Sequence, residues 1–323
     1  MLLVIPHLFP TARLLETAAH DLRLPALKTV LTRGARQACT TDGVEAYLCE
    51  RLGIERQQDW PIAPITLEAD GGHAESAYWL RADPVHLSVM RDRIVLADSA
   101  TLDLGQSEAD ALTTSIHAHF GAAFSPRPVR PQRWYLRLPE PPQLATTPLS
   151  CAAGRDIDPL LPRGRDAQRF RALMNELQML LHDHPVNQAR EARGALPVNS
   201  LWLWGGGLLP KPGSSSLRVA SSNPEIVALA RFAGAGLAPA PDRSSDEHAG
   251  IAVIDTLVAS SRVGDAFGWR EAIRQIENHL HALLRTGQAF TLADPMRGIA
   301  CRWGGRNRFQ FWRRRAPLKD VLK

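Results

Sequence analysis

The sequence predicts an α/β fold, with a largely parallel sheet flanked by helices in the C-terminal half and a smaller α+β N-terminal part. Strand-like apolar runs and segments of helical periodicity alternate through the C-terminal half, which is the pattern of a parallel sheet with crossover helices. The N-terminal half mixes both kinds of segment less regularly. A chain of 323 residues can hold one large domain or two ordinary ones.

Composition and charge limit the class of protein. Apolar residues make up 45% of the chain and charged residues 22%, which is typical of a soluble globular protein. No apolar run is long enough to span a membrane, and the opening MLLVIPHLFP lacks the basic region of a signal peptide. The four cysteines are scattered and form no CxxC pair, so a zinc ribbon and a redox motif are not indicated. We therefore expect a cytoplasmic protein without a cofactor.

The N-terminal part should open with a strand and then continue as short helices and hairpin strands. Residues 107–110 have the order of a capping box, which predicts a helix that continues to Phe120. Asp92 and Arg93 separate two extended segments as the turn of a hairpin would. The expected helices are 11–22, 42–52 and 107–120, and the expected further strands are 78–87, 94–96 and 133–138.

Seven prolines lie between Ser125 and Pro148. Proline prevents regular helix and is disfavoured in central strands. We therefore predict a Pro-rich linker at 139–150, between an N-terminal α+β part at 1–138 and a C-terminal α/β part at 151–323. The alternative is a long surface connection within one single domain.

The C-terminal part should begin with a helix whose apolar face runs from Phe170 to Leu181. Pro185 disfavours helical geometry at His184, so this helix should end there. Asn223, Pro224 and Glu225 have the order of a helix start. The expected later elements are strands at 201–204, 251–258, 289–292 and 307–312, and a helix at 266–284.

The polar segment between the first of these helices and the strand at 201–204 is the candidate binding site. Arg190 and Arg193 are three residues apart, so on a helix they lie on one face, and two guanidinium groups suit a phosphate or carboxylate. The glycines at 205–207 allow a ligand to approach the backbone or the chain to turn. We predict an anion-binding site near the surface, for a phosphorylated or anionic small molecule, formed by His184, Asn187, Arg190, Arg193 and Asn199.

A structural alternative stays open for this segment. Arginines on a helix usually belong to a solvated face, and glycines after a strand usually form a turn. In that case Asn187 and Asn199 would satisfy backbone groups and bind no ligand.

The same segment carries a resemblance to a known family. It resembles the HPVNxxR…G…PAN…WLWG segment of archaeal-type cofactor-independent phosphoglycerate mutases, members of the alkaline phosphatase superfamily. The resemblance implies an alkaline phosphatase-like fold for roughly the C-terminal half. The whole chain is similar to a bacterial family named phosphoglycerate mutase or RpfE, a regulator of pathogenicity factors. The matching residues are His184, Pro185, Val186, Asn187, Arg190, Gly194, Pro197, Asn199 and Trp202–Gly205.

The sequence departs from that family where the resemblance implies two metal ions and a serine nucleophile. The family's Asp-Gly is replaced by Pro6-His7, and its Asp-x-x-x-His by residues 259–262, Ala-Ser-Ser-Arg. Asp294 stands without the histidine that should follow it. Two-metal chemistry needs a symmetric set of ligands. We therefore predict no catalytic residues and no metal site, and a non-catalytic regulatory or ligand-binding protein.

Two alternatives to that function remain. The protein is a phosphoglycerate mutase or another phosphate-ester enzyme if Asp255, Asp294, His182 and His184 supply metal ligands in a rebuilt site. It is a nucleic-acid-associated protein if the basic tail at 302–323 is a binding arm. That tail has eight basic residues and one acidic residue, a local charge of +7 within a net charge of +5. The favoured interpretation of the tail is an edge strand, in which Trp303, Phe309 and Phe311 alternate with polar residues.

Overall fold

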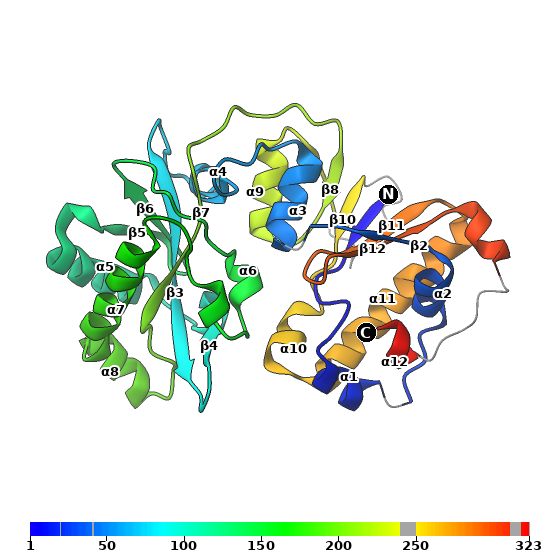
Figure 1. Ribbon diagram of the computed structural model, residues 1–323, viewed down its shortest axis with the longest axis horizontal. Helices are drawn as coiled ribbons and strands as arrows, with labels where there is room; N and C mark the ends of the chain where they lie inside the picture. The colour runs from blue at the N-terminus through cyan, green and yellow to red at the C-terminus, as the bar shows by residue number, and fades with distance from the viewer. Residues whose placement is uncertain (20, 41, 240–249, 311–317, 323) are drawn as a thin grey trace. The chain divides into compact units, whose positions relative to one another are not determined.

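The computed structural model describes residues 1–19, 21–40, 42–239, 250–310 and 318–322, and they form two compact units (Figure 1). The first unit combines Met1–Leu52 with Gly213–Lys323, and the second is Gly53–Pro212. The boundary predicted at 139–150 lies inside the second unit. Pro139 directly follows the last residue of β6 (Arg133–Leu138), whereas the chain passes between units near residues 52 and 212.

The first unit is built on a seven-stranded sheet. Five neighbouring strands are parallel, in the order β11-β1-β10-β8-β9, and β12 and β2 extend the β11 edge in antiparallel pairing. The prediction of an α/β class with a largely parallel sheet is thereby confirmed. The strands are β1 (Leu2–Val4), β2 (Ala35–Ala38), β8 (Arg218–Ala220), β9 (Gly236–Ala238), β10 (Ile251–Val253), β11 (Phe290–Asp294) and β12 (Ile299–Trp303).

Helices cover both faces of this sheet (Figure 1). On one face α1 (Ala12–Ala18), α2 (Pro25–Arg33) and α11 (Ala266–Thr286) bury a core that includes Leu3, Leu292 and Trp269. Helix α11 also caps α2, because the two carboxylate oxygens of Glu277 accept from Ala26 N and Leu27 N at 2.6 and 2.8 Å. The remaining helices are α3 (Gly43–Leu52) and α9 (Pro224–Phe232), which pack together, and α10 (Val258–Val263) and α12 (Leu318–Val321).

The second unit is built on an antiparallel sheet. Its long strand β3 (Tyr78–Val89) pairs with β6 (Arg133–Leu138), β4 (Ile94–Ala97) and β7 (Ser200–Gly207), and β5 (Pro126–Arg130) lies at the edge beside β6. An edge strand tolerates proline because one side of its backbone needs no partner, which is why the proline-rich β5 forms. The strand predicted at 201–204 thus belongs to this sheet and not to the parallel one.

The helices of the second unit also lie on both faces of their sheet. Apolar side chains of α5 (Gln106–Phe120) and α7 (Ala167–His182) pack with Leu80, Leu136 and Leu203 on one face. On the other face α4 (Ile62–Ala69) packs on Trp79 and Tyr135. The shorter helices are α6 (Leu149–Ala152) and α8 (Pro185–Ala192), and 3-10 turns occur at Ser99–Thr101, Gly121–Ala123 and Asp158–Leu160.

Two local predictions are wrong in detail. Helix α5 begins one residue earlier than the expected capping box, because Glu108 Oε2 accepts from Gly105 N at 3.0 Å and caps that position instead. The strand predicted at 307–312 is replaced by a 3-10 turn at Gly305–Phe309, where Asn307 Oδ1 accepts from Gly304 N at 2.7 Å. The part of this expectation that falls on 311–312 lies outside the described residues.

The basic tail divides into parts with different surroundings. Trp303 is buried at the end of β12, whereas Phe309 is 58% exposed, so the alternation predicted for an edge strand stops at Trp303. Near the end of the chain, Val321 and Leu322 are buried in the core of the first unit. Phe311 and the arginines at 313–315 lie outside the described residues, and binding of nucleic acid by 302–323 stays a prediction. No helix within the described part of the chain is long and apolar enough to cross a membrane.

Candidate functional site

The predicted anion site forms an elbow between α7 and β7, starting at His184. Pro185 occupies the first turn of α8, where a missing N–H costs nothing, and His184 is the N-cap. His184 Nδ1 accepts from Val186 N at 3.2 Å, and its Nε2 lies 2.9 Å from Ser115 Oγ on α5. Burial lowers the pKa of His184, which favours the neutral ring that this cap requires.

The two asparagines of the elbow bind backbone groups. Asn187 Nδ2 donates to the carbonyls of Leu181 and Val198 at 2.7 and 2.8 Å, and its Oδ1 accepts from Val198 N at 2.9 Å. Asn199 accepts from Leu87 N at 2.7 Å and donates to Leu87 O at 3.0 Å, as a paired strand residue would. Asn187 therefore joins the end of α7 to the start of β7, and Asn199 joins the elbow to β3.

Arg190 is fully buried, with 0% of its surface exposed. Its Nε donates to Leu196 O at 2.8 Å, its Nη1 to Glu108 Oε2 at 2.8 Å, and its Nη2 to Leu102 O. Arg193, whose side chain is 51% exposed, binds the other oxygen of the same carboxylate at 2.7 Å. The two guanidinium groups predicted to hold an anion thus share Glu108 as a counter-ion.

Glu108 is held as a carboxylate by these contacts. Burial by itself would raise its pKa, but the hydrogen bond from Gly105 N and the bonds and charges of Arg193 and Arg190 lower the pKa below its usual range. The carboxylate is 17% exposed. An external anion at Arg190 would have to displace this ionised partner and open a buried site.

The elbow brings the predicted residues together as expected, but not at the surface. Asn187 is 1% exposed and Arg190 0% exposed, so the expectation of a surface cluster is wrong for both. Helical spacing placed Arg190 and Arg193 on one face of α8, but did not show that Glu108 of α5 lies against both of them. The hydrogen bonds and burial favour the structural alternative for Asn187, Arg190 and Asn199.

The three glycines after Trp204 belong to β7 and do not form a turn. A Cβ atom at Gly205 would meet Ile62, one at Gly206 would meet Tyr78, and one at Gly207 would meet Pro61. Gly205 also has φ +66°, a left-handed conformation that favours glycine. Close packing within the second unit accounts for these glycines without a ligand.

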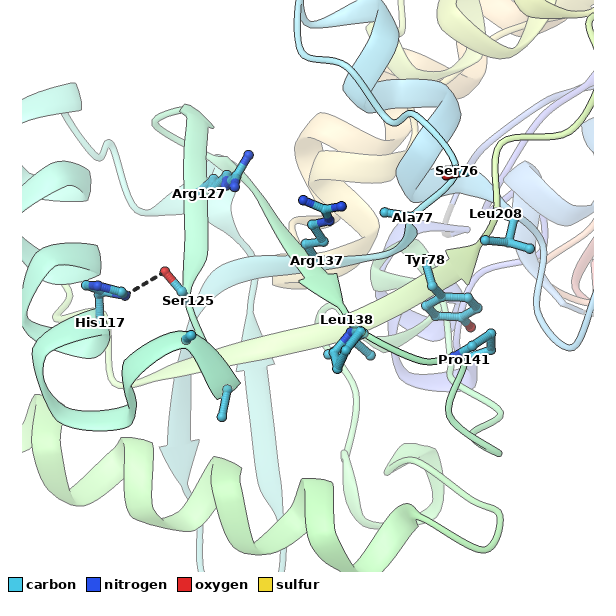
Figure 2. A pocket seen from close by; sticks show the side chains of 13 residues that line it. Ser76, Ala77, Tyr78, His117, Ser125, Arg127, Arg137, Leu138, Pro141 and Leu208 are labelled. Atoms are coloured by element: carbon cyan, nitrogen blue, oxygen red, sulfur yellow. Dashed lines mark hydrogen bonds between the residues drawn. The ribbon is translucent and has the colours of Figure 1, made fainter.

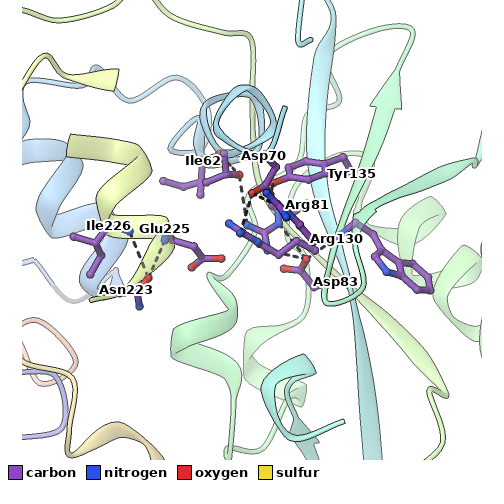
Figure 3. Close-up of polar contacts among 12 residues, drawn as sticks. Ile62, Asp70, Arg81, Asp83, Arg130, Tyr135, Asn223, Glu225 and Ile226 are labelled. Carbon is purple, nitrogen blue, oxygen red and sulfur yellow. Dashed lines mark hydrogen bonds and ion pairs between the residues drawn. The ribbon is translucent and has the colours of Figure 1, made fainter. Parts of the chain in front are cut away.

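Sequence reasoning missed a buried ion pair in the centre of the same sheet (Figure 3). Arg81 Nε and Nη2 donate to Asp83 Oδ1 at 3.0 and 2.9 Å, and the two residues are 1% and 0% exposed. Asp83 Oδ2 accepts from Trp204 Nε1 at 2.7 Å. The Arg81 guanidinium lies 5.1 and 5.3 Å from the rings of Trp204 and Tyr135. An arginine and an aspartate two apart in an apolar strand was the signal, because i and i+2 share a face.

A second layer of charge surrounds this pair. Tyr135 donates to Asp70 Oδ2 at 2.6 Å, and Arg133 Nη2 lies 2.8 Å from Asp70 Oδ1. Each oxygen of Asp83 is bonded within the protein, so this network is suited to fixing β3, β6 and β7 together.

The positions where the resemblance implies metal ligands lie at the carboxyl ends of parallel strands in the first unit. Pro6 and His7 follow β1 and Asp294 ends β11, whereas residues 259–262 lie in α10. Asp255, considered as a ligand of a rebuilt site, lies two residues after β10. Asp294 is fully buried, and its oxygens accept from Phe9 N at 3.1 Å and Met296 N at 3.0 Å. It therefore holds the chain after β1 against the end of β11.

These residues do not fit a two-metal centre. Within the part of the chain that the structure describes, no group of three or more His, Cys, Asp or Glu side chains has an arrangement that could hold a metal ion. The carboxylate of Asp294 is already engaged by backbone N–H groups.

Asp294 should make stability depend on pH. Burial raises its pKa from 3.8 to about 6, against the hydrogen bonds from Phe9, Met296 and His7. Because the folded state then binds the proton more tightly than the unfolded state, the free energy of unfolding should fall as pH rises from 4 to 6, by about 2 to 3 kcal/mol, and level off above 6. Chemical denaturation at pH 4.5, 5.5 and 7 should show this slope, and Asp294→Asn should reduce it. Equal slopes in both proteins would contradict this role.

Comparison with known proteins relates the chain to phosphoglycerate mutases. It is 27% identical over 242 residues to a probable 2,3-bisphosphoglycerate-independent phosphoglycerate mutase of Geobacter sulfurreducens, covering 74% of this chain and 59% of that protein. It is 33% identical over 161 residues to the 2,3-bisphosphoglycerate-independent phosphoglycerate mutase of Methanosarcina acetivorans, covering 47% of this chain and 38% of that protein. The chain resembles cofactor-independent phosphoglycerate mutases. It spans less than two thirds of the length of these relatives, and no protein family model matches it.

The fold is similar to that of a solved structure. The PH0037 protein from Pyrococcus horikoshii superposes with a TM-score of 0.50 at 12% identity, covering 96% of this chain and 91% of that chain. A cofactor-independent phosphoglycerate mutase from Thermoplasma acidophilum gives a TM-score of 0.42 at 18% identity, with 94% and 89% of the two chains covered. The likeness to the Pyrococcus protein supports the mixed α/β architecture of this phosphoglycerate mutase-like scaffold.

Proposed function

We propose that this protein is a non-catalytic regulatory or ligand-binding protein on a degenerate phosphoglycerate mutase-like scaffold of the alkaline phosphatase superfamily. Its ligand is a phosphorylated or anionic small molecule. A regulator of the RpfE kind, the second resemblance in the sequence, fits this class. This function requires no metal ion and no covalent step.

One observation carries the proposal: the acidic residue that remains at the expected metal position has a structural task. Asp294 accepts from Phe9 N and Met296 N while fully buried, so each of its oxygens already binds a backbone group inside the protein. Pro6 and His7 stand where the related enzymes carry an Asp-Gly. A two-metal clamp needs several carboxylates and imidazoles that converge on one point. The segment from His184 to Gly207, in contrast, resembles the mutases, and packing within the second unit accounts for its motif residues.

The direct test is an assay for interconversion of the two phosphoglycerates. With magnesium, manganese or cobalt we expect turnover well below about 1 per second, the lower end of ordinary enzyme rates. Calorimetric titration of the metal-stripped protein with manganese should show no tight site. A metal-dependent phosphoglycerate mutase, assayed in parallel, controls for the assay conditions. Metal-dependent turnover at about 1 per second or faster would overturn the proposal.

The alternative is that the protein is a cofactor-independent phosphoglycerate mutase or another phosphate-ester enzyme. The similarity to proteins of that name in Geobacter sulfurreducens and Methanosarcina acetivorans favours it. It requires metal ligands from positions other than those of the family pattern. The same assay separates the two functions, because only the enzyme converts substrate.

A further inference from the structure

A cavity of about 780 Å3 lies at one end of the antiparallel sheet of the second unit (Figure 2). It is bordered by the start of β3 and β5, the end of β6 and the last turn of α5. Its volume falls in the range of small-molecule sites. None of the residues that form the predicted elbow site lines it, so it is a separate candidate.

Basic and hydroxyl side chains form one part of the wall. Arg127 on β5 is paired with Tyr135 on β6, and Arg137 lies two residues further along β6, so both arginines project from the same face of the sheet. Arg127 lies 5.5 Å above the Trp79 ring, which restricts its guanidinium. His117, on the last turn of α5, has its Nδ1 2.9 Å from Ser125 Oγ (Figure 2).

The balance of charge in this wall is positive. None of the described residues that line the cavity is an aspartate or glutamate. Arg137 has a neighbouring acid in Glu75 at 3.8 Å, but the two side chains are 53% and 67% exposed, so solvent weakens this contact. Arg190 differs, because the carboxylate of Glu108, which is 17% exposed, already pairs with it.

The rest of the wall is apolar. It is lined by Tyr78, Leu138, Pro139, Pro141 and Leu208. The two prolines come from the segment predicted as a linker. Proline keeps this wall rigid in the absence of regular secondary structure. An apolar wall beside a few convergent polar groups is the usual composition of a ligand site.

We propose that this cavity binds a small amphipathic oxyanion, with a phosphate or carboxylate group at Arg127 and Arg137 and an apolar body against Ala77, which packs with Trp79 on the same face of the sheet as the arginines. Planar guanidinium groups bind either oxyanion through paired hydrogen bonds. This inference rests on the proposed ligand-binding function and gives it a location different from the elbow.

The test uses 1-naphthyl phosphate and 1-naphthoate as probes, with neutral 1-naphthol for comparison, by calorimetric titration. At least one anionic probe should bind the natural sequence at least tenfold more tightly than 1-naphthol. Arg127→Gln and Arg137→Gln should each weaken that binding about tenfold, which corresponds to 1.4 kcal/mol. Arg130→Gln is the matched control, because Arg130 lies on the same strand, is 55% exposed and faces Asp70 outside the cavity. It should change binding less than twofold.

Each result has a distinct meaning. Binding of both anions by the same arginines means that the site accepts a phosphate or a carboxylate group. Binding of one probe alone identifies which of the two groups the site takes. Absence of binding by the natural sequence, or equal weakening by Arg130→Gln and Arg137→Gln, overturns the inference. Release of 1-naphthol from the phosphate ester would contradict the non-catalytic function, yet would leave the location of the site intact.

Discussion

Replacing Arg190 by alanine should lower the free energy of unfolding by about 3 to 5 kcal/mol, one of the largest effects expected for a single substitution. Its guanidinium binds Leu102 O, Leu196 O and Glu108 in a site that solvent does not reach. The variant loses these bonds and leaves the carboxylate without its buried partner. Urea denaturation followed by circular dichroism measures the change.

Arg193→Ala is the matched control for that variant, because Arg193 binds the other oxygen of the same Glu108. Its side chain is 51% exposed, so its removal should cost less than about 1 kcal/mol. If Arg190→Ala does not fold, Arg190→Lys takes its place. It keeps the charge but loses the fork of donors, so its loss of unfolding free energy should lie between those expected for Arg190→Ala and Arg193→Ala. A small effect of Arg190→Ala on unfolding, together with loss of thermal protection by phosphate, would make the elbow an anion site.

The helices and strands of the elbow were predictable because their signals are local. The apolar face from Phe170 to Leu181 gave α7, and Pro185 gave the break before α8. Strand β7 followed from the apolar run after Asn199. Each signal lies within a few residues of the element that it describes.

The partners of these elements were not predictable from the same signals. Glu108 lies 82 residues before Arg190, and periodicity on α8 does not show which element covers its polar face. The order of strands is equally non-local, since β1 at the N-terminus lies between β10 and β11. The division into halves therefore differed from the two units, although the fold class was right.

The arginines of the cavity illustrate the same limit. Arg127 lies in a proline-rich segment for which the sequence predicted neither regular helix nor central strand, and Arg137 lies on another strand. Only the register of β5 with β6 places them on one face. A site assembled across strands leaves no fixed spacing in the sequence.

The second large effect is expected at Asp83. Asp83→Ala should cost about 3 to 5 kcal/mol, because it leaves the Arg81 charge buried without its carboxylate and removes the acceptor of Trp204 Nε1. Glu271→Ala, which removes a half-exposed pair with Arg274 on α11, is the control and should cost less than about 1 kcal/mol.

A double-mutant cycle with Arg81→Met separates the ion pair from the tryptophan bond. Once Arg81 is absent, removal of Asp83 no longer leaves a buried charge unpaired, so its cost should fall by about 2 kcal/mol or more. The part that remains reports the lost acceptor for Trp204 Nε1 and Trp134 N. The cost should also persist in 1 M salt, because ions do not screen a pair that solvent cannot reach. Their 2.9 Å contact predicts coupling between Arg81 and Asp83. Additive single effects would contradict this and would mean that the two residues stabilise the sheet independently.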